Sequence, residues 1–149
     1  MHEGSLAYST ATALIEYAKE HNIKRATKVE IGIGELTMID EEIYKNWLIE
    51  MLKGSPYDSA EIRLVKEPVR FKCNICNYNW SLDEVKEKVI ENICKEIVDC
   101  DTPIHYLPEI AQAYVTCPKC NSRDFEIISG EGIIIRSINY VEWCERLRY

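Results

Sequence analysis

Apolar residues recur at three- and four-residue steps in two stretches near the start of the chain, as on the buried face of a helix. The first stretch predicts a helix from Ser5 to about His21. The second predicts a helix from Asp40, whose side chain can cap the first turn, to about Leu52. The residues expected to face inward in the second helix are Ile43, Trp47, Leu48, Met51 and Leu52.

Strand patterns separate and follow the two helices. Residues 28–33 alternate between apolar residues and polar residues or glycine, which is typical of a strand with one buried face. A second strand is predicted at 60–66, a short one at 125–128, and a longer, isoleucine-rich one at 133–141. Pro68 and Gly130 interrupt the pattern and suggest where one part of the chain gives way to another.

Four cysteines form two Cys-x-x-Cys pairs, a spacing that lets two thiolates hold one metal ion from a tight turn. Four thiolates around one ion are typical of structural zinc. Each pair is followed by an asparagine, Asn77 or Asn121, a residue type that tolerates the left-handed backbone at the end of such a turn. The alternative is four unrelated buried cysteines. The paired residues are Cys73, Cys76, Cys117 and Cys120.

The order of these elements predicts an α+β fold: a three-stranded mixed sheet with two helices, plus an inserted zinc-ribbon-like module. One domain is expected to comprise 1–68 with 130–149, and a second to comprise 69–129. The forty residues between the cysteine pairs exceed the usual spacing, so a helical insert is expected at 81–116. Within this insert, helices are predicted at 82–97 and 108–113.

Charge and length narrow the possible partners. The chain has 149 residues, with 18 Lys and Arg against 25 Asp and Glu, for a net charge of −7. This acidic balance argues against nucleic acid as a partner, because binding phosphates depends on clustered basic residues. No apolar run is long enough to span a membrane, and the first residues lack the pattern of a signal peptide. We therefore expect a cytoplasmic protein whose thiols remain reduced.

The amino terminus offers a second metal site of a different kind. The terminal amine of Met1, the amide nitrogen of His2 and the His2 imidazole can chelate one ion together. Such a nitrogen-rich, planar set suits Ni(II) or Cu(II), whereas zinc prefers a tetrahedron. Glu3 can add a carboxylate oxygen. The alternative is that His2 is a solvated residue at a frayed end.

Several segments in this order resemble the HypA family of nickel metallochaperones. The resemblance covers nearly the whole chain except part of the insert, and the long insert itself resembles that of archaeal members. A Cys-x-x-Cys pair by itself is common in zinc proteins. The combination of an initial Met-His-Glu with two such pairs in this order is specific to the family. The matching segments are Met1-His2-Glu3, Ser5-Leu6-Ala7, Ile33-Gly34-Glu35-Leu36, Arg70-Phe71-Lys72-Cys73, Cys117-Pro118-Lys119-Cys120-Asn121-Ser122 and the stretch Ile127–Ile138.

The resemblance implies that the first domain binds Ni(II) through a terminal site that includes His2. It implies delivery of nickel to the large subunit of nickel-iron hydrogenase, together with a HypB-type GTPase, while Zn(II) holds the second domain. We predict His105 as a further nickel ligand beside Met1 and His2, because twelve residues separate it from Cys117 and a linker of that length can fold back. The alternative for His105 is a core histidine.

Two other functional classes compete with this hypothesis. A zinc-ribbon module that binds protein or nucleic acid would explain the cysteines but not the amino terminus. An enzyme is not expected, because the chain carries no catalytic motif that we find, and a zinc ion with four thiolates has no open position for water. Whether the chain is a monomer or a dimer stays open. Cys94, Cys100 and Cys144 are expected to be buried thiols, with redox sensing or a second metal as the alternative for Cys94 or Cys100.

Overall fold

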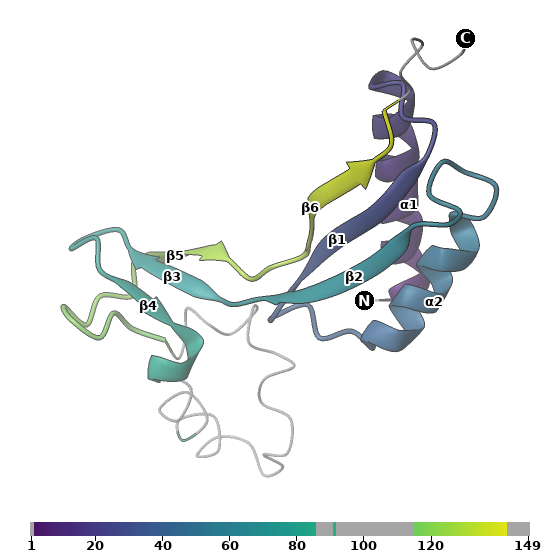
Figure 1. The fold of residues 1–149 in the computed structure, drawn as a ribbon. Helices are drawn as coiled ribbons and strands as arrows, with labels where there is room; N and C mark the ends of the chain where they lie inside the picture. The colour runs from purple at the N-terminus through teal and green to yellow at the C-terminus, as the bar shows by residue number, and fades with distance from the viewer. Residues whose placement is uncertain (1, 86–90, 92–114, 143–149) are drawn as a thin grey trace, which may run out of the picture. The chain divides into compact units, whose positions relative to one another are not determined.

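The computed structural model describes residues 2–85, 91 and 115–142, and shows the predicted α+β fold (Figure 1). Most of the predicted insert 81–116, including its expected helices, lies outside the described residues. The chain splits into two compact units. In chain order the elements are α1 (Glu3–Glu20), β1 (Ala26–Gly34), α2 (Glu41–Met51), β2 (Glu61–Glu67), β3 (Arg70–Cys73), β4 (Asn79–Ser81), β5 (Phe125–Ser129) and β6 (Ile133–Tyr140).

The first unit holds a mixed three-stranded sheet in the order β2-β1-β6, with both helices against one face (Figure 1). Ala26 donates its N–H to Pro56 O at the start of β1, and Val141 donates to Arg25 O at the end of β6. The β1-α2-β2 crossover makes β2 parallel to β1, whereas β6 returns antiparallel. This confirms the mixed sheet predicted from the sequence. The unit consists of Met1–Gly32, Ile39–Val65 and Ile133–Tyr149.

The buried face of α2 differs from the predicted one. Leu48 and Leu52 are buried as predicted, but Ile43 and Trp47 are 46% and 50% exposed. Tyr44, which was not expected to face inward, is fully buried. The Tyr44 hydroxyl lies 2.7 Å from Thr10 Oγ1 of α1 in a buried hydrogen bond. A phenol whose hydroxyl has a polar partner can be buried at little cost. The buried face of α2 therefore includes Tyr44 in place of its neighbour Ile43, which a pattern of aliphatic residues alone does not predict.

The second unit contains a small sheet in the order β4-β3-β5 with an aromatic core. Phe71 of β3 lies opposite Trp80 of β4 and stacks on it at a ring-centroid distance of 5.5 Å. Phe125 of β5 meets both rings edge to face. The strand β4 was not predicted, because a three-residue strand leaves no periodic pattern. This unit consists of Ile33–Met38 and Lys66–Gly132.

Two glycines of the second unit let backbone segments approach closely. A Cβ added at Gly34 would press on the carbonyl oxygen of Gly130 and would lie 2.8 Å from Gly132 O. Gly130 itself has a positive φ of 95°, in the region that favours glycine. Leu36 N–H bonds to Gly130 O in the same place. A side chain at position 34 would therefore have to move backbone atoms rather than a flexible side chain.

We expect Gly34→Ala to destabilise the protein by about 2–3 kcal/mol, since overpacking against backbone is costly. Gly4→Ala serves as the matched control, because its added Cβ would meet Trp47 at 3.8 Å, an ordinary contact. Urea unfolding monitored by circular dichroism measures both variants. Equal stability of Gly34→Ala and the natural protein would contradict the close approach.

Candidate metal centre

Two turns of the same shape present the four cysteines. In each turn the asparagine after the second cysteine donates its N–H to the first cysteine's carbonyl, from Asn77 to Cys73 at 3.0 Å and from Asn121 to Cys117 at 2.8 Å. Both asparagines have left-handed backbone, with φ of 63° and 62°. The left-handed residue closes each turn so that its two thiols point the same way, as the sequence predicts.

The four sulfur atoms lie close enough to share one metal ion. All four Sγ atoms are within 4.8 Å of one another, and the shortest separations are 3.5 Å, for Cys73 to Cys120 and for Cys76 to Cys117. Tetrahedral zinc with bonds near 2.3 Å requires sulfur–sulfur separations of about 3.8 Å. The cysteines therefore fit a zinc ion after small movements, and a four-thiolate set leaves no position for a fifth ligand such as water.

Backbone N–H groups point at the first sulfur of each turn. Cys73 Sγ accepts from Cys76 N–H at 3.5 Å and from Ile75 N–H at 3.4 Å, and these bonds hold the pKa of Cys73 below its ordinary value. Burial opposes ionisation of Cys117, but N–H bonds from Cys120 and Lys119 outweigh it and lower the pKa of Cys117 to about 7. Thiolates are the form that binds metal, so these N–H groups favour the ligand state of the first cysteine in each turn. At Cys120 a backbone hydrogen bond from Ser122 is outweighed by burial and the three neighbouring sulfur atoms, which raise the pKa of Cys120 to about 12.

The surroundings of the cluster suit a structural rather than a catalytic metal. Cys73 and Cys117 are buried in the core of the second unit, while Cys76 is half-buried and Cys120 exposed. That core also contains Phe71, Trp80 and Phe125. The cluster thus fastens the small sheet to the segment that follows the insert, which is the role expected of a closed zinc site.

His2 lies at the start of the first helix in the other unit. It is the residue before α1, its carbonyl accepts from Leu6 N–H at 3.2 Å, and its side chain makes no capping hydrogen bond. The residue is exposed. The helix therefore holds the His2 backbone in place, while the imidazole has no capping role and is available as a ligand.

The next residue, Glu3, is fastened to the second helix. Its Oε1 accepts from the N–H of Asp40 at 3.0 Å, and Asp40 Oδ1 in turn accepts from Ile43 N–H at 3.0 Å as the cap of α2. The sequence predicted the Asp40 cap but not the link to Glu3, because nothing in the spacing connects residues 37 positions apart. Glu3 therefore joins the helix that carries His2 to the beginning of α2.

The Asp40 N–H, with a smaller contribution from the Glu3 amide itself, lowers the pKa of Glu3 from its ordinary value of 4.5. A depressed pKa stabilises the fold above pH 4.5, and the contribution is lost as the pH falls through the lowered value. We expect Glu3→Gln to be less stable than the natural protein at pH 7, with the difference shrinking in acid. Thermal unfolding at pH 7 and pH 3 measures it, and a difference that grows in acid would contradict this account.

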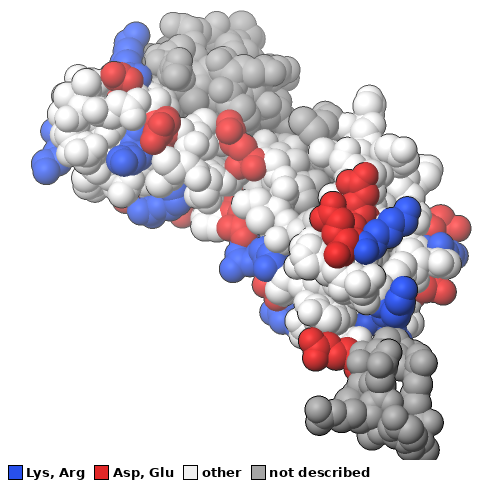
Figure 2. Space-filling view, turned by 90° about the horizontal axis from the view of Figure 1, so that it is seen from above, with Lys and Arg blue, Asp and Glu red and all other residues white. Residues whose placement is uncertain are grey.

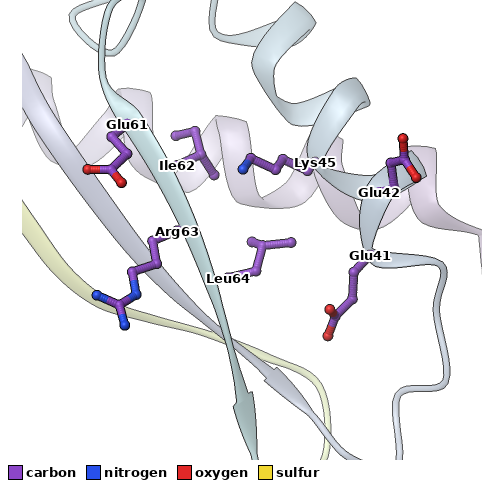
Figure 3. A pocket seen from close by; sticks show the side chains of 7 residues that line it. All are labelled: Glu41, Glu42, Lys45, Glu61, Ile62, Arg63 and Leu64. Carbon is purple, nitrogen blue, oxygen red and sulfur yellow. The ribbon is translucent and has the colours of Figure 1, made fainter.

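An open hollow of about 490 Å³ lies between α2 and β2 in the first unit (Figure 3). Ile62 and Leu64 point toward α2, while Glu61 and Arg63 point away from it (Figure 3). The α2 side of the hollow is formed by Glu41, Glu42 and Lys45. Among the described residues its lining includes neither histidine nor cysteine, so it offers neither the imidazole predicted for nickel nor the thiolates predicted for zinc.

The structure brings together some of the predicted ligands and leaves others untested. The four cysteines form the group of potential metal ligands found among the described residues. His2 and Glu3 are adjacent at the start of α1. Met1 and His105 lie outside the described residues, as do Cys94, Cys100 and Cys144. The nickel ligand set therefore stays a prediction.

Comparison with known proteins decides the family. The model of the family described as "Hydrogenase/urease nickel incorporation, metallochaperone, hypA" matches residues 1–140. The chain belongs to the HypA family. HypA proteins are nickel metallochaperones of hydrogenase maturation and are not enzymes, and both statements hold for this chain. The predicted family, function and absence of catalysis are thereby confirmed.

Individual relatives agree with the HypA assignment. Hydrogenase maturation factor HypA of Thermococcus kodakarensis is 37% identical over 138 residues, which cover 93% of this chain and 94% of the relative. The HypA factor of Pyrococcus horikoshii is 36% identical over the same shares. The solution structure of the nickel metallochaperone HypA from Helicobacter pylori shares the fold, with a TM-score of 0.61 and 21% identity over 95% of this chain and 98% of that one. The relatives from Thermococcus kodakarensis and Pyrococcus horikoshii are archaeal, as the resemblance implied.

No helix among residues 2–85, 91 and 115–142 combines the length and apolar character needed to cross a membrane.

Proposed function

We propose that nickel binds at the amino terminus, through the Met1 amine and the amide and imidazole of His2, with His105 as a further ligand. The observation that carries the proposal is the placement of His2 immediately before α1, exposed and without a capping role. The carboxylate of Glu3 fixes the same turn to Asp40, so the chelating residue starts from a fixed backbone. Glu3 keeps a second oxygen that can add to the site.

The four-cysteine cluster holds zinc in this proposal, as a structural ion that stays bound when nickel is released. Four thiolates around zinc form a closed site, whereas a terminal chelate has open positions through which ligands exchange. A carrier has to release its cargo, so the open site suits nickel and the closed site suits the structural ion. The cysteines have to stay reduced, which fits the cytoplasm expected from the sequence.

The recipient in this proposal is the large subunit of nickel-iron hydrogenase, reached with the help of a HypB-type GTPase. Support comes from membership of the HypA family, whose role is hydrogenase maturation. The charge distribution adds to it: on the face of the described residues in Figure 2, Lys and Arg are interspersed with Asp and Glu and form no continuous basic patch. Such a surface suits a protein partner better than nucleic acid.

Extension of the amino terminus tests the proposal directly. Nickel titration of untagged protein that begins at Met1 is compared with protein carrying two residues, Gly-Ser, before Met1. The extension moves the free amine away from His2, so tight nickel binding should be lost while zinc content stays the same. The same two residues added after Tyr149 serve as the control. Equal nickel binding by all three proteins would overturn the terminal site and leave a zinc-ribbon module.

A second titration separates His105 from the other ligands. His105→Ala should weaken nickel binding and change the visible spectrum, because one nitrogen of the planar set would be replaced by water or another oxygen. Unchanged affinity and spectrum would remove His105 from the site while leaving the terminal chelate intact.

A further inference from the structure

The first turn of α1 holds the backbone of His2 and contains a glycine. Gly4 is the second residue of this helix, and glycine is the least favourable residue in a helix apart from proline. The first N–H groups of a helix have no partner within it, and helix ends fray. The bond from Leu6 N–H to His2 O at 3.2 Å closes the turn. Contacts from outside the helix are therefore important for how well the turn is formed.

The indole of Trp47 in α2 lies over this turn. A Cβ built at Gly4 would lie 3.8 Å from Cε2 of the indole and 3.9 Å from both Cδ2 and Nε1. These three atoms are neighbours in the five-membered ring, and nearly equal distances to them mean that the Cβ direction meets the face of the ring. The second helix thus covers Gly4 with the flat side of an aromatic side chain.

Trp47 adds little to the core of the first unit. Half of its surface is exposed, whereas Tyr44 and Leu48 of the same helix are fully buried. Trp47 also lines an open groove of about 310 Å³ with Ile43 and two polar residues of α2. A large aromatic side chain that lies outside the core and over a glycine of another helix suggests a role at that glycine.

We propose that Trp47 is a positioning residue for the nickel site, because its indole holds the first turn of α1 and with it the backbone of His2. The inference rests on the proposed terminal site and adds to it a residue that acts without binding the ion. Two contacts from α2 then hold consecutive residues, since the Asp40 N–H bonds to Glu3 and the indole covers Gly4. The apparent affinity for nickel scales with the fraction of molecules in which this turn is formed.

Exchange of the Leu6 amide hydrogen measures the turn in the absence of nickel, because this amide bonds to His2 O. In zinc-loaded, nickel-free protein, Trp47→Ala should speed Leu6 exchange about 5-fold, which corresponds to about 1 kcal/mol. Trp47→Phe should speed it less, since a smaller ring still covers the glycine. Ile49→Ala is the control, because Ile49 is a similarly exposed residue of α2 that does not line the groove. Unchanged Leu6 exchange in Trp47→Ala would overturn the proposal.

Moving the indole to the other helix separates this contact from a general effect on folding. Gly4→Trp alone leaves no room for its ring, because the Cβ direction already meets the indole of Trp47. Combined with Trp47→Ala, the new ring has the vacated space and links the two helices again. Each substitution alone should speed Leu6 exchange, whereas the double variant should return toward the natural rate. A double variant that exchanges at least as fast as Trp47→Ala would overturn this contact as the cause.

Nickel titration of the same proteins connects the turn to the cargo. If Trp47→Ala leaves the turn formed in about one third of the molecules, nickel binds about 3-fold more weakly, with zinc content unchanged and recovery in the double variant. Faster Leu6 exchange with unchanged nickel affinity would overturn the positioning role while the terminal site stands. If the terminal site itself is wrong, the Gly-Ser extension before Met1 leaves nickel binding unchanged, and the role of Trp47 in nickel binding falls with it.

Discussion

Replacing Cys73 with serine is expected to abolish zinc binding and unfold the second unit of the protein. The sheet of this unit has strands of only four, three and five residues, and its core depends on Phe71, Trp80 and Phe125. A core of this size supplies little stability without a metal. In small zinc domains the metal contributes about 10 kcal/mol or more to folding, so its loss exceeds what the aromatic core can offset.

The expected result has two measurable parts. Metal analysis should show less than one tenth of the natural zinc content, and near-ultraviolet circular dichroism should lose the signal of the buried Trp80. The first unit has its own core, including Leu14, Val29 and Leu48, so most of the helical signal should remain.

A substitution in the same turn controls for local disturbance. Ile75 lies between the two cysteines of the first pair, and its side chain is 64% exposed. Ile75→Ser should retain zinc and the Trp80 signal. Retention of zinc and of a folded second unit by Cys73→Ser would show that three thiolates suffice, and the closed four-ligand site would be wrong.

The cysteine cluster was predictable because its signal is local. Two short spacings fix the pairs, and Asn77 and Asn121 mark the left-handed closing residues that both turns contain. The strands of the mixed sheet were predictable for a related reason. The alternation of apolar and polar residues along 28–33 indicates a strand with one buried face, whichever strand it pairs with. Patterns of this kind depend on neighbours in the sequence.

Features that depend on distant residues were not predictable from the sequence. The bond between Glu3 and the Asp40 N–H joins segments whose proximity follows only from the packing of α1 on α2. Burial of Tyr44 in place of Ile43 depends on a hydroxyl partner, Thr10, in another helix. The short strand β4 forms because Phe71 offers a surface for Trp80, and three residues alone have no preference strong enough to show it.

The two links at the amino terminus suggest how the proposed chelate can be positioned. The His2 carbonyl is bonded to Leu6 in the first turn of α1, and Glu3 is bonded to the cap of α2. In the proposed nickel site, the backbone that carries the His2 imidazole is therefore already fixed before a metal ion binds. Ordering fewer groups lowers the entropic cost of binding. A His2 backbone held by α1 therefore lowers the entropic cost of the proposed nickel site.

His2→Ala should remove tight nickel binding while leaving zinc and the fold unchanged. The substitution deletes one nitrogen of the proposed chelate and breaks the six-membered ring it forms with the amide, which we expect to cost about 100-fold in affinity, or roughly 2.7 kcal/mol. Folding should be unaffected, because the His2 side chain makes no capping bond. Nickel titration followed by calorimetry, with zinc analysis of the same samples, measures both effects.

His21→Ala is the matched control at the other end of the same helix. Its ring stacks on Tyr17 at a centroid distance of 3.9 Å, and its Nδ1 lies 3.0 Å from Tyr17 O, so the substitution removes an imidazole that already has partners. Nickel affinity should stay at the natural value in this variant. Because amine and imidazole bind nickel only when deprotonated, the natural protein and His21→Ala should both bind more weakly in mild acid. The residual binding of His2→Ala should depend less steeply on pH, because only the amine of this pair remains to be deprotonated. If His2→Ala keeps natural affinity while His21→Ala loses it, the nickel site is not at the amino terminus.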